Sequence, residues 1–134
     1  MKILIKVKLQ DLVNASQTLR NLGDKPLRGK LAYKVGKIIQ QVSNELELYD
    51  NARRELLEKY CEKNEDGTLN IHEDGNVLVL PENISIYNEE IKKMNETEIE
   101  LNIVLLDLDE LENIEMTPKE MIQIDWIIKK EEAE

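Results

Sequence analysis

The sequence has few of the residues on which several common chemistries depend. Its 134 residues include one cysteine, one histidine, five glycines and no phenylalanine. A single cysteine excludes a disulfide within the chain. A lone histidine leaves a zinc site without the additional nitrogen or sulfur ligands that it needs. The glycines form neither a phosphate-binding loop nor a dinucleotide fingerprint, so we expect no metal, no cofactor and no nucleotide hydrolysis.

Long apolar runs are also absent. No stretch reaches the roughly 18 apolar residues that a membrane-spanning helix requires, and no segment of signal-peptide type opens the sequence. Hydrophobic residues make up 41% and charged residues 34% of the chain, which is typical of a globular protein. We therefore expect a cytoplasmic protein, without membrane contact, that folds as a single domain over residues 1–134 around an aliphatic core.

The formal charge of −10 is unevenly distributed. Residues 1–60 carry 12 basic and 7 acidic side chains, whereas residues 61–134 carry 6 basic and 21 acidic ones. The overall charge argues against direct nucleic-acid binding, because phosphate neutralisation supplies most non-specific affinity. Two interpretations of the asymmetry remain open. The two halves attract each other within the monomer or across a dimer, or they present an acidic and a basic face to different partners.

The first 60 residues favour a strand followed by two helices. Residues 3–9 alternate between apolar and polar side chains and then give way to a helical pattern that includes Val13 and ends at Gly23. A second amphipathic pattern runs from Pro26 to Tyr60 and predicts one helix of roughly 35 residues, about 50 Å long. Because this helix is longer than a small domain is wide, we expect a second copy to cover part of its apolar stripe, in a homodimer or other homo-oligomer.

The remaining residues predict short elements. Residues 68–71 and 77–80 form a predicted hairpin, residues 84–94 a helix and residues 98–104 another strand. A capping box at Thr117 predicts a final helix that directs Met121, Ile124 and Ile127 inward. The predicted fold class is α+β, with a long amphipathic helix and shorter helices packed on a small antiparallel sheet of about three strands.

The segment EKNEDGTLNIHEDG (62–75) resembles a twelve-residue calcium loop with Gly67 as its sixth residue. Such a loop needs an exiting helix to hold its twelfth residue, here Glu73, but strand-type residues follow. We therefore interpret the segment as two turns, in which Asp66–Gly67 closes the long helix and Asp74–Gly75 reverses the hairpin. His72 and Cys61 lack companions for a metal site.

Two charged surfaces are candidate binding sites, and no group of residues forms a recognisable catalytic site. One is a basic flank on and before the long helix, formed by Arg20, Lys25, Arg28, Lys30, Lys34 and Lys37. The other lies in the acidic run ELNIVLLDLDELENIEM (100–116) and just before it. Its predicted partner-binding residues are Glu98, Glu100, Asp107, Asp109, Glu110 and Glu112. On an extended edge these carboxylates would imitate a phosphate backbone; otherwise they belong to a strand and an acidic loop.

The order of several segments resembles that of small proteins encoded by phages and prophages of Gram-positive bacteria. The matching segments are LVNASQTLRNL, LAYKVGKIIQQV, ELYDNARRELLEKYCEKNEDG, YNEEIKKMNETEIEL and TPKEMIQIDWII. The resemblance implies a viral gene acting in the host bacterial cytoplasm, and it carries over no active residue.

We therefore predict a non-enzymatic, phage-encoded protein that binds and inhibits a host or defence factor through protein–protein contacts. A virion assembly or tail chaperone factor is the first alternative. A small-ligand binding protein, with a nucleotide against Lys30, Lys34 or Arg28, is the second.

Overall fold

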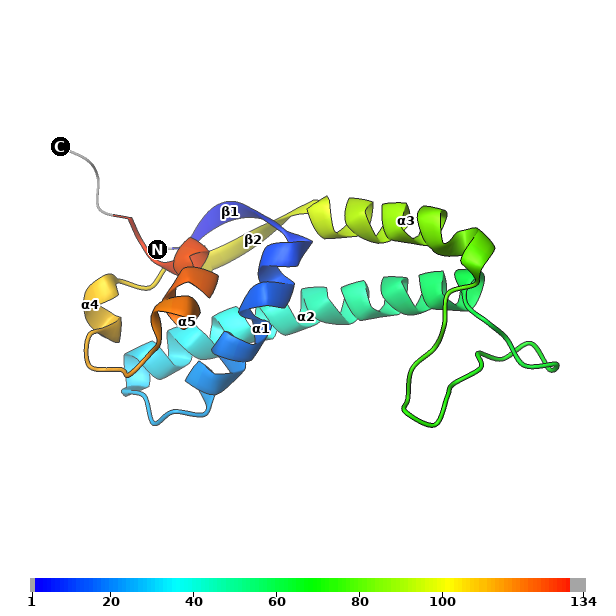
Figure 1. Cartoon of the computed structure of the whole chain (residues 1–134). Coiled ribbons are helices and arrows are strands. Elements are labelled where there is room, and N and C mark those ends of the chain that lie inside the picture. The colour runs from blue at the N-terminus through cyan, green and yellow to red at the C-terminus, as the bar shows by residue number, and fades with distance from the viewer. Residues whose placement is uncertain (1, 131–134) are drawn as a thin grey trace. The chain divides into compact units, whose positions relative to one another are not determined.

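The computed structural model describes residues 2–130, which form two compact units (Figure 1). Unit 1 contains the residues up to Leu46 together with those from Glu98 onward, and unit 2 is Glu47–Thr97. Helix α2 (Gly29–Tyr60) supplies residues to both units. The single domain predicted for residues 1–134 stays a prediction, because two compact units can still fold cooperatively.

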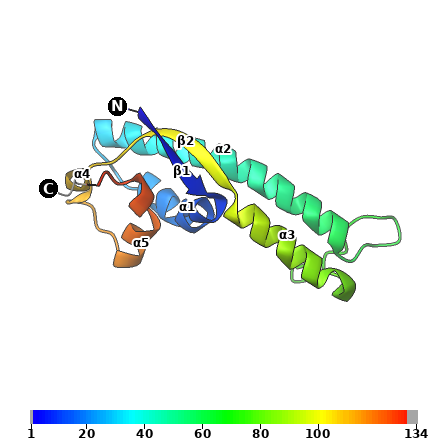
Figure 2. The ribbon, with the colours of Figure 1, turned by 90° about the horizontal axis from the view of Figure 1, so that it is seen from above.

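The sheet of unit 1 has two antiparallel strands, β1 (Lys2–Lys8) and β2 (Glu98–Val104), which run side by side (Figure 2). β2 spans the residues predicted for it. Alternation places Val7, Leu101 and Ile103 on the buried face. The α+β class is confirmed, but the prediction of about three strands is not, because residues 2–130 contain only this two-stranded sheet.

Helix α1 (Leu9–Gly23) begins directly after β1. It buries one stripe at the three- and four-residue spacing of a helix, consisting of Leu12, Ala15, Thr18, Leu19 and Leu22. Val13 was expected in this stripe, but it is 39% exposed because it lies off that face. Gly23 ends the helix as predicted. A Cβ atom there would lie 2.8 Å from Ile39 of α2, so the small residue permits close packing of the two helices.

The predicted long helix is confirmed as one continuous helix of 32 residues. It begins at Gly29 rather than at Pro26, because residues 24–28 connect α1 to α2. The amide of Ala32 makes an early helical bond to the carbonyl of Arg28 at 2.7 Å. The helix buries Leu31, Val35, Ile38 and Val42 in unit 1.

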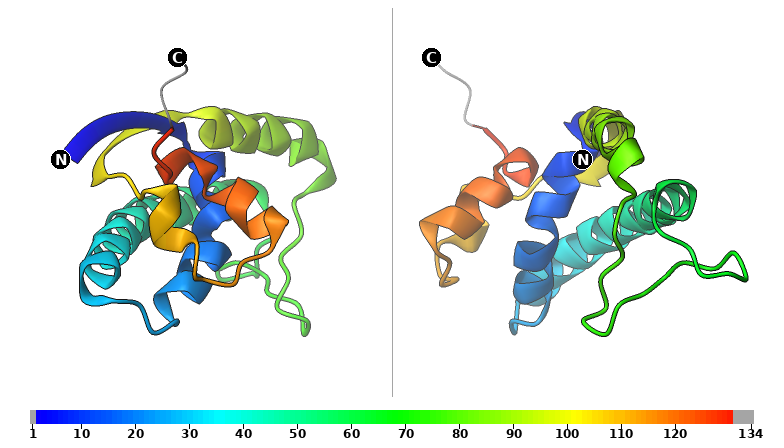
Figure 3. Two further views of the ribbon diagram at one scale, coloured as in Figure 1. Left: turned by 90° about the vertical axis from the view of Figure 1, so that its left-hand side faces the viewer. Right: turned by 45° about the vertical axis from the view of Figure 1, so that its right-hand side comes forward.

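The last part of unit 1 consists of α4 (Leu108–Leu111), α5 (Pro118–Gln123) and the 3-10 turn η2 (Asp125–Ile127). The predicted capping box starts α5, since the amide of Glu120 donates to Thr117 Oγ1 at 3.1 Å. α5 lies beside α1 (Figure 3), and Thr18 donates a hydrogen bond to Gln123. Of the side chains expected to point inward, Ile124 and Ile127 are buried and Met121 is half-buried.

Unit 2 contains the second part of α2, the 3-10 turn η1 (Pro81–Asn83) and α3 (Ile84–Glu96). The two helices meet through the edge-to-face rings of Tyr60 and Tyr87, whose centres are 6.4 Å apart. Tyr49 adds a hydrogen bond to Asn95 Oδ1 at 2.6 Å. Only Tyr60 and Cys61 are fully buried in this unit, so its core is small.

The predicted hairpin strands 68–71 and 77–80 do not pair with each other. They bond instead to residues just after α2, through isolated bridges between Cys61 and Val79 and between Lys63 and Leu69. The turn at Asp74–Gly75 is confirmed by a 2.8 Å bond from the amide of Gly75 to the carbonyl of His72 and by a φ of +83°. Asp66–Gly67 forms a separate turn and does not close α2, which ends at Tyr60.

Candidate protein-binding surfaces

The two aspartates of the calcium-like segment are engaged in turns. Asp66 Oδ1 accepts hydrogen bonds from the hydroxyl and the amide of Thr68, which lower the pKa of Asp66. Asp74 accepts bonds from the amide and the side chain of Asn76, which lower its pKa. Within residues 2–130, His, Cys, Asp and Glu side chains form no cluster of three that could hold a metal ion.

Cys61 and His72 lie in different surroundings. Cys61 is buried, and this burial raises the pKa of its thiol. His72 is exposed, with Nε2 3.2 Å from Glu62 Oε2. In the described part of the chain, every helix is too short or too polar to cross a membrane.

The first two predicted partner-binding acids lie on the outer face of the sheet. Glu98 is opposite Lys8 and Glu100 is opposite Lys6 in the β1–β2 register. Opposite charges in directly facing positions attract each other, so part of the negative charge of β2 is compensated within the fold. The acidic run 100–116 is not one extended edge, because β2 ends at Val104 and α4 follows.

Glu110 connects the acidic and the basic surfaces. Its Oε1 lies 2.8 Å from Lys34 Nζ and also accepts a 3.0 Å bond from the amide of Asp107. Burial raises the pKa of Glu110, but the bonds from Lys34 and Asp107 and the positive charges of Lys34 and Lys30 outweigh it and lower the pKa. Attraction between the oppositely charged parts of the chain therefore occurs within unit 1 at this contact.

We predict that Glu110→Gln reduces the free energy of unfolding at neutral pH by about 1 kcal/mol, because it removes a partly buried ion pair. The pKa of Glu110 is lower in the folded than in the unfolded chain, so its contribution is present above the ordinary glutamate pKa. That contribution is lost as the pH falls through the lowered value. Urea unfolding between pH 3 and pH 7 measures this difference.

The exposed Glu112 supplies the matched control for that measurement. Glu112→Gln changes the same charge in the same segment and should alter stability by less than about 0.5 kcal/mol. A pH-independent effect of Glu110→Gln, or an equal effect of Glu112→Gln, would contradict the assignment.

The residues of the basic flank have different neighbours in the structure. Arg28 and Lys30 line a cavity of about 430 Å³ that is also bordered by Asp109 and Glu110. Lys37 Nζ lies 5.5 Å from the ring centre of Tyr33 on the same helix. The charge of Lys25 contributes to a lowered pKa of Glu120, for which the amide of Thr117 is the main cause. Arg20 lines a separate cavity of about 70 Å³ beside α2. The six residues therefore have different neighbours within the fold.

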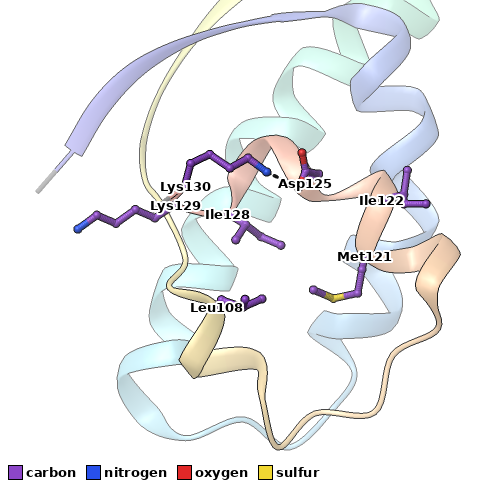
Figure 4. A pocket seen from close by; sticks show the side chains of 7 residues that line it. All are labelled: Leu108, Met121, Ile122, Asp125, Ile128, Lys129 and Lys130. Carbon is purple, nitrogen blue, oxygen red and sulfur yellow. Dashed lines mark hydrogen bonds and ion pairs between the residues drawn. The ribbon is translucent and has the colours of Figure 1, made fainter. Parts of the chain in front are cut away.

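An apolar groove lies between α4 and the α5–η2 segment, with a volume of about 530 Å³ (Figure 4). We call it the α4–α5 groove. It is lined by Leu108, Met121, Ile122, Asp125, Ile128, Lys129 and Lys130. Leu108 is 57% and Ile122 75% exposed. In Figure 4 the side chains of Leu108, Met121 and Ile128 lie around the same space, and Lys130 pairs with Asp125 at its border.

The α4–α5 groove is not predicted from the sequence pattern. Leu108 stands between Asp107 and Asp109, and the interpretation of that run considers its carboxylates as the binding groups. A usable signal was present, because Leu108 and Leu111 are the first and last residues of a four-residue helix in which Asp109 and Glu110 are charged. Leu106 and Leu111 are buried, which leaves Leu108 outside.

Unit 2 also carries large apolar side chains that are exposed. They are Leu48, Ile71, Leu78, Ile84 and Ile86. Within Glu47–Thr97 there are 13 acidic and 6 basic side chains, so these apolar residues lie in a strongly negative unit.

Comparisons with protein-family models, with curated proteins and with solved structures found no match to this chain. Function is therefore inferred from the contacts and exposed side chains of the chain itself.

Proposed function

We propose that the chain is a non-enzymatic, phage- or prophage-encoded protein that binds a host or defence factor in the bacterial cytoplasm and inhibits it by occupying its surface. The α4–α5 groove is the observation on which this proposal rests. Contiguous exposed apolar surface with a polar border is a common mark of a protein-interaction site. Because Leu108 and Ile122 remain exposed, their burial contributes little to the stability of the fold. A partner that covered them would remove this apolar area from water.

The volume of the groove is suited to an anchor side chain. About 530 Å³ exceeds the size of a single leucine or phenylalanine, so one or two large apolar side chains of a partner fit into it. Anchors of this kind supply most of the affinity at interfaces, and the surrounding polar contacts mainly exclude water.

Charge beside the groove indicates the character of the partner. Asp107 and Asp109 flank Leu108 in the chain, and both Asp109 and Glu112 are exposed. Four of the six predicted partner-binding acids are already engaged within the fold: Glu98 and Glu100 face lysines, Glu110 pairs with Lys34, and Asp107 belongs to the capping box of α4. Asp109 and Glu112 are therefore the two best placed to contact another protein. The lining of the groove itself carries Lys129 and Lys130, of which Lys130 pairs with Asp125. A partner with an apolar anchor and charges of both signs around it is complementary to this border, and such charges mainly accelerate association.

The central test is co-purification of the tagged chain from a Gram-positive host. Leu108→Ser combined with Ile122→Ser should reduce partner recovery at least tenfold, because loss of an anchor contact costs about 2 kcal/mol or more. Leu48→Ser is the matched control: Leu48 is 63% exposed on α2 in unit 2, and its loss should leave recovery unchanged. Circular dichroism confirms that each variant is folded. Equal recovery with all variants would contradict the groove as the binding site.

The identity and activity of the recovered partner separate inhibition from the assembly alternative. A host enzyme or defence protein that loses activity when saturated with the chain supports the proposal. A phage structural protein would instead support the virion assembly or tail chaperone function. Full partner activity at saturating chain would make the inhibitory function wrong.

A small-ligand function is the second candidate, and the cavity bordered by Arg28 and Lys30 is the observation that favours it. The same cavity contains Asp109 and Glu110, whose charge opposes a nucleotide phosphate. Native mass spectrometry of the chain taken from infected cells should show the bare mass if protein binding is the function. A stoichiometric mass increment of nucleotide size would favour the ligand function.

A further inference from the structure

We infer that the open edge of β1 is a docking site for an extended acidic segment of another protein, which adds to the sheet as a third strand. By open edge we mean the side of residues 2–7 that faces away from β2, since the amide of Lys8 already donates to Asp11 Oδ2 at 3.2 Å. This surface is independent of the α4–α5 groove and implies a second mode of binding.

The backbone of β1 has hydrogen-bonding capacity left over. Among residues 2–130, the main chain of residues 2–7 bonds to no segment other than β2. In an antiparallel pair, every second residue directs its N–H and C=O groups away from the partner strand. An edge of this kind is a template for another strand, because main-chain bonds supply affinity and alternate side chains supply selectivity.

The opposite edge of the sheet is less available. The carbonyl of Asn102 in β2 accepts a 2.9 Å hydrogen bond from Gln41 Nε2 of α2. Helix α2 therefore already occupies part of the β2 edge, and strand addition is favoured at β1.

The side chains of β1 indicate the chemistry of the added strand. Leu4 is 69% exposed, and Lys2, Lys6 and Lys8 are exposed on the same face of the strand. On its paired side, this face is matched by carboxylates, with Glu98 opposite Lys8 and Glu100 opposite Lys6. An incoming strand with acidic residues in the equivalent positions repeats these pairs, each worth about 0.2–1 kcal/mol.

A second copy of β1 is a poor occupant for the same reason. Antiparallel pairing centred on Ile5 would bring Lys2 opposite Lys8, and pairing centred on Leu4 would bring Lys2 opposite Lys6. Like charges in directly facing positions destabilise a pair of strands. The occupant we propose is therefore an acidic, alternating segment of a different protein.

Strand β2 itself supplies a probe of suitable chemistry. A fluorescent peptide with its sequence, EIELNIV, should bind the full chain at least tenfold more tightly than the charge-reversed peptide KIKLNIV, as measured by fluorescence anisotropy at low salt. Hydrogen exchange should slow at outward-facing amides of β1 while the amides of β2 keep their protection. Loss of β2 protection would mean displacement of β2 rather than strand addition, and would overturn the inference.

An exchange of charge within the sheet provides the decisive variant. Lys6→Glu combined with Glu100→Lys reverses the charge at position 6 of the open edge, while it keeps opposite charges facing each other between β1 and β2. This variant should lose about tenfold in affinity for EIELNIV and gain affinity for KIKLNIV. The Leu108→Ser, Ile122→Ser variant should bind EIELNIV as the unmodified chain does. Equal binding of both peptides, or loss of binding in the groove variant, would overturn the inference.

Discussion

Replacing Leu12 with alanine is expected to reduce the free energy of unfolding by about 2–5 kcal/mol. Leu12 is fully buried in α1, in the stripe that also contains Ala15 and Leu19. The substitution removes apolar contacts and leaves a cavity that rigid neighbours fill only partly. Urea unfolding, followed by the fluorescence of the single tryptophan, Trp126 in unit 1, measures the change.

Val13→Ala is the matched control for that experiment. Val13 is the next residue of the same helix, is 39% exposed and loses a smaller apolar side chain. Alanine also has the higher helix propensity, so we expect a change of less than about 0.5 kcal/mol. If both substitutions destabilise the chain equally, the buried face of α1 is assigned incorrectly.

A proline at position 47 should be the second severe substitution, with a cost of about 3 kcal/mol or more. Glu47 is an exposed residue in the interior of α2, between Leu46 of unit 1 and the rest of unit 2. Proline would remove a helical N–H donor, and its ring would collide with the carbonyl of Ser43 one turn earlier. The loss is measured as reduced ellipticity at 222 nm together with a lower urea midpoint.

Glu47→Ala separates the backbone effect from loss of the side chain. It keeps the helical bond and should leave both measurements nearly unchanged. If α2 were in fact two helices that meet at this position, proline would fall in a first turn, where it is well tolerated. A mild effect of Glu47→Pro would therefore contradict a continuous helix.

Elements with strong local patterns could be predicted from the sequence. The alternation of residues 98–104 and the spacing of apolar residues after Gly29 each reflect burial of one face, which is a local property of the chain. The capping box at Thr117 was also predictable, because both of its hydrogen bonds join residues three apart. The start of α2 was predicted three residues early, since proline permits a helix start without requiring one there.

The hairpin was predicted wrongly because strand-type residues do not specify their partner. Residues 68–71 and 77–80 have suitable composition and a turn between them, yet each bonds to the segment that follows Tyr60. That segment offers backbone groups freed by the end of α2. Which backbone donors and acceptors pair depends on how the chain folds in space, and the residue composition of a strand does not specify this.

For the candidate binding surfaces, the sequence predicted which residue types take part but not how those residues are arranged in space. The charged residues were recognised, but the pairing of Glu110 with Lys34 joins positions 76 apart in the sequence. The α4–α5 groove depends on the placement of Leu108 against Met121 and Ile128. The interpretation of residues 100–116 emphasised their carboxylates and did not predict the α4–α5 groove.

The pairing of β1 with β2 also constrains how the protein emerges from the ribosome. Lys8 and Glu98 are facing residues, yet about 90 residues separate them in the chain. At roughly 5–20 residues per second, β1 waits about 5–20 s during synthesis before its partner strand exists. Through that interval both edges of this aliphatic strand lack a partner strand and are exposed to solvent, so nascent chains should depend on chaperones more than the finished fold does.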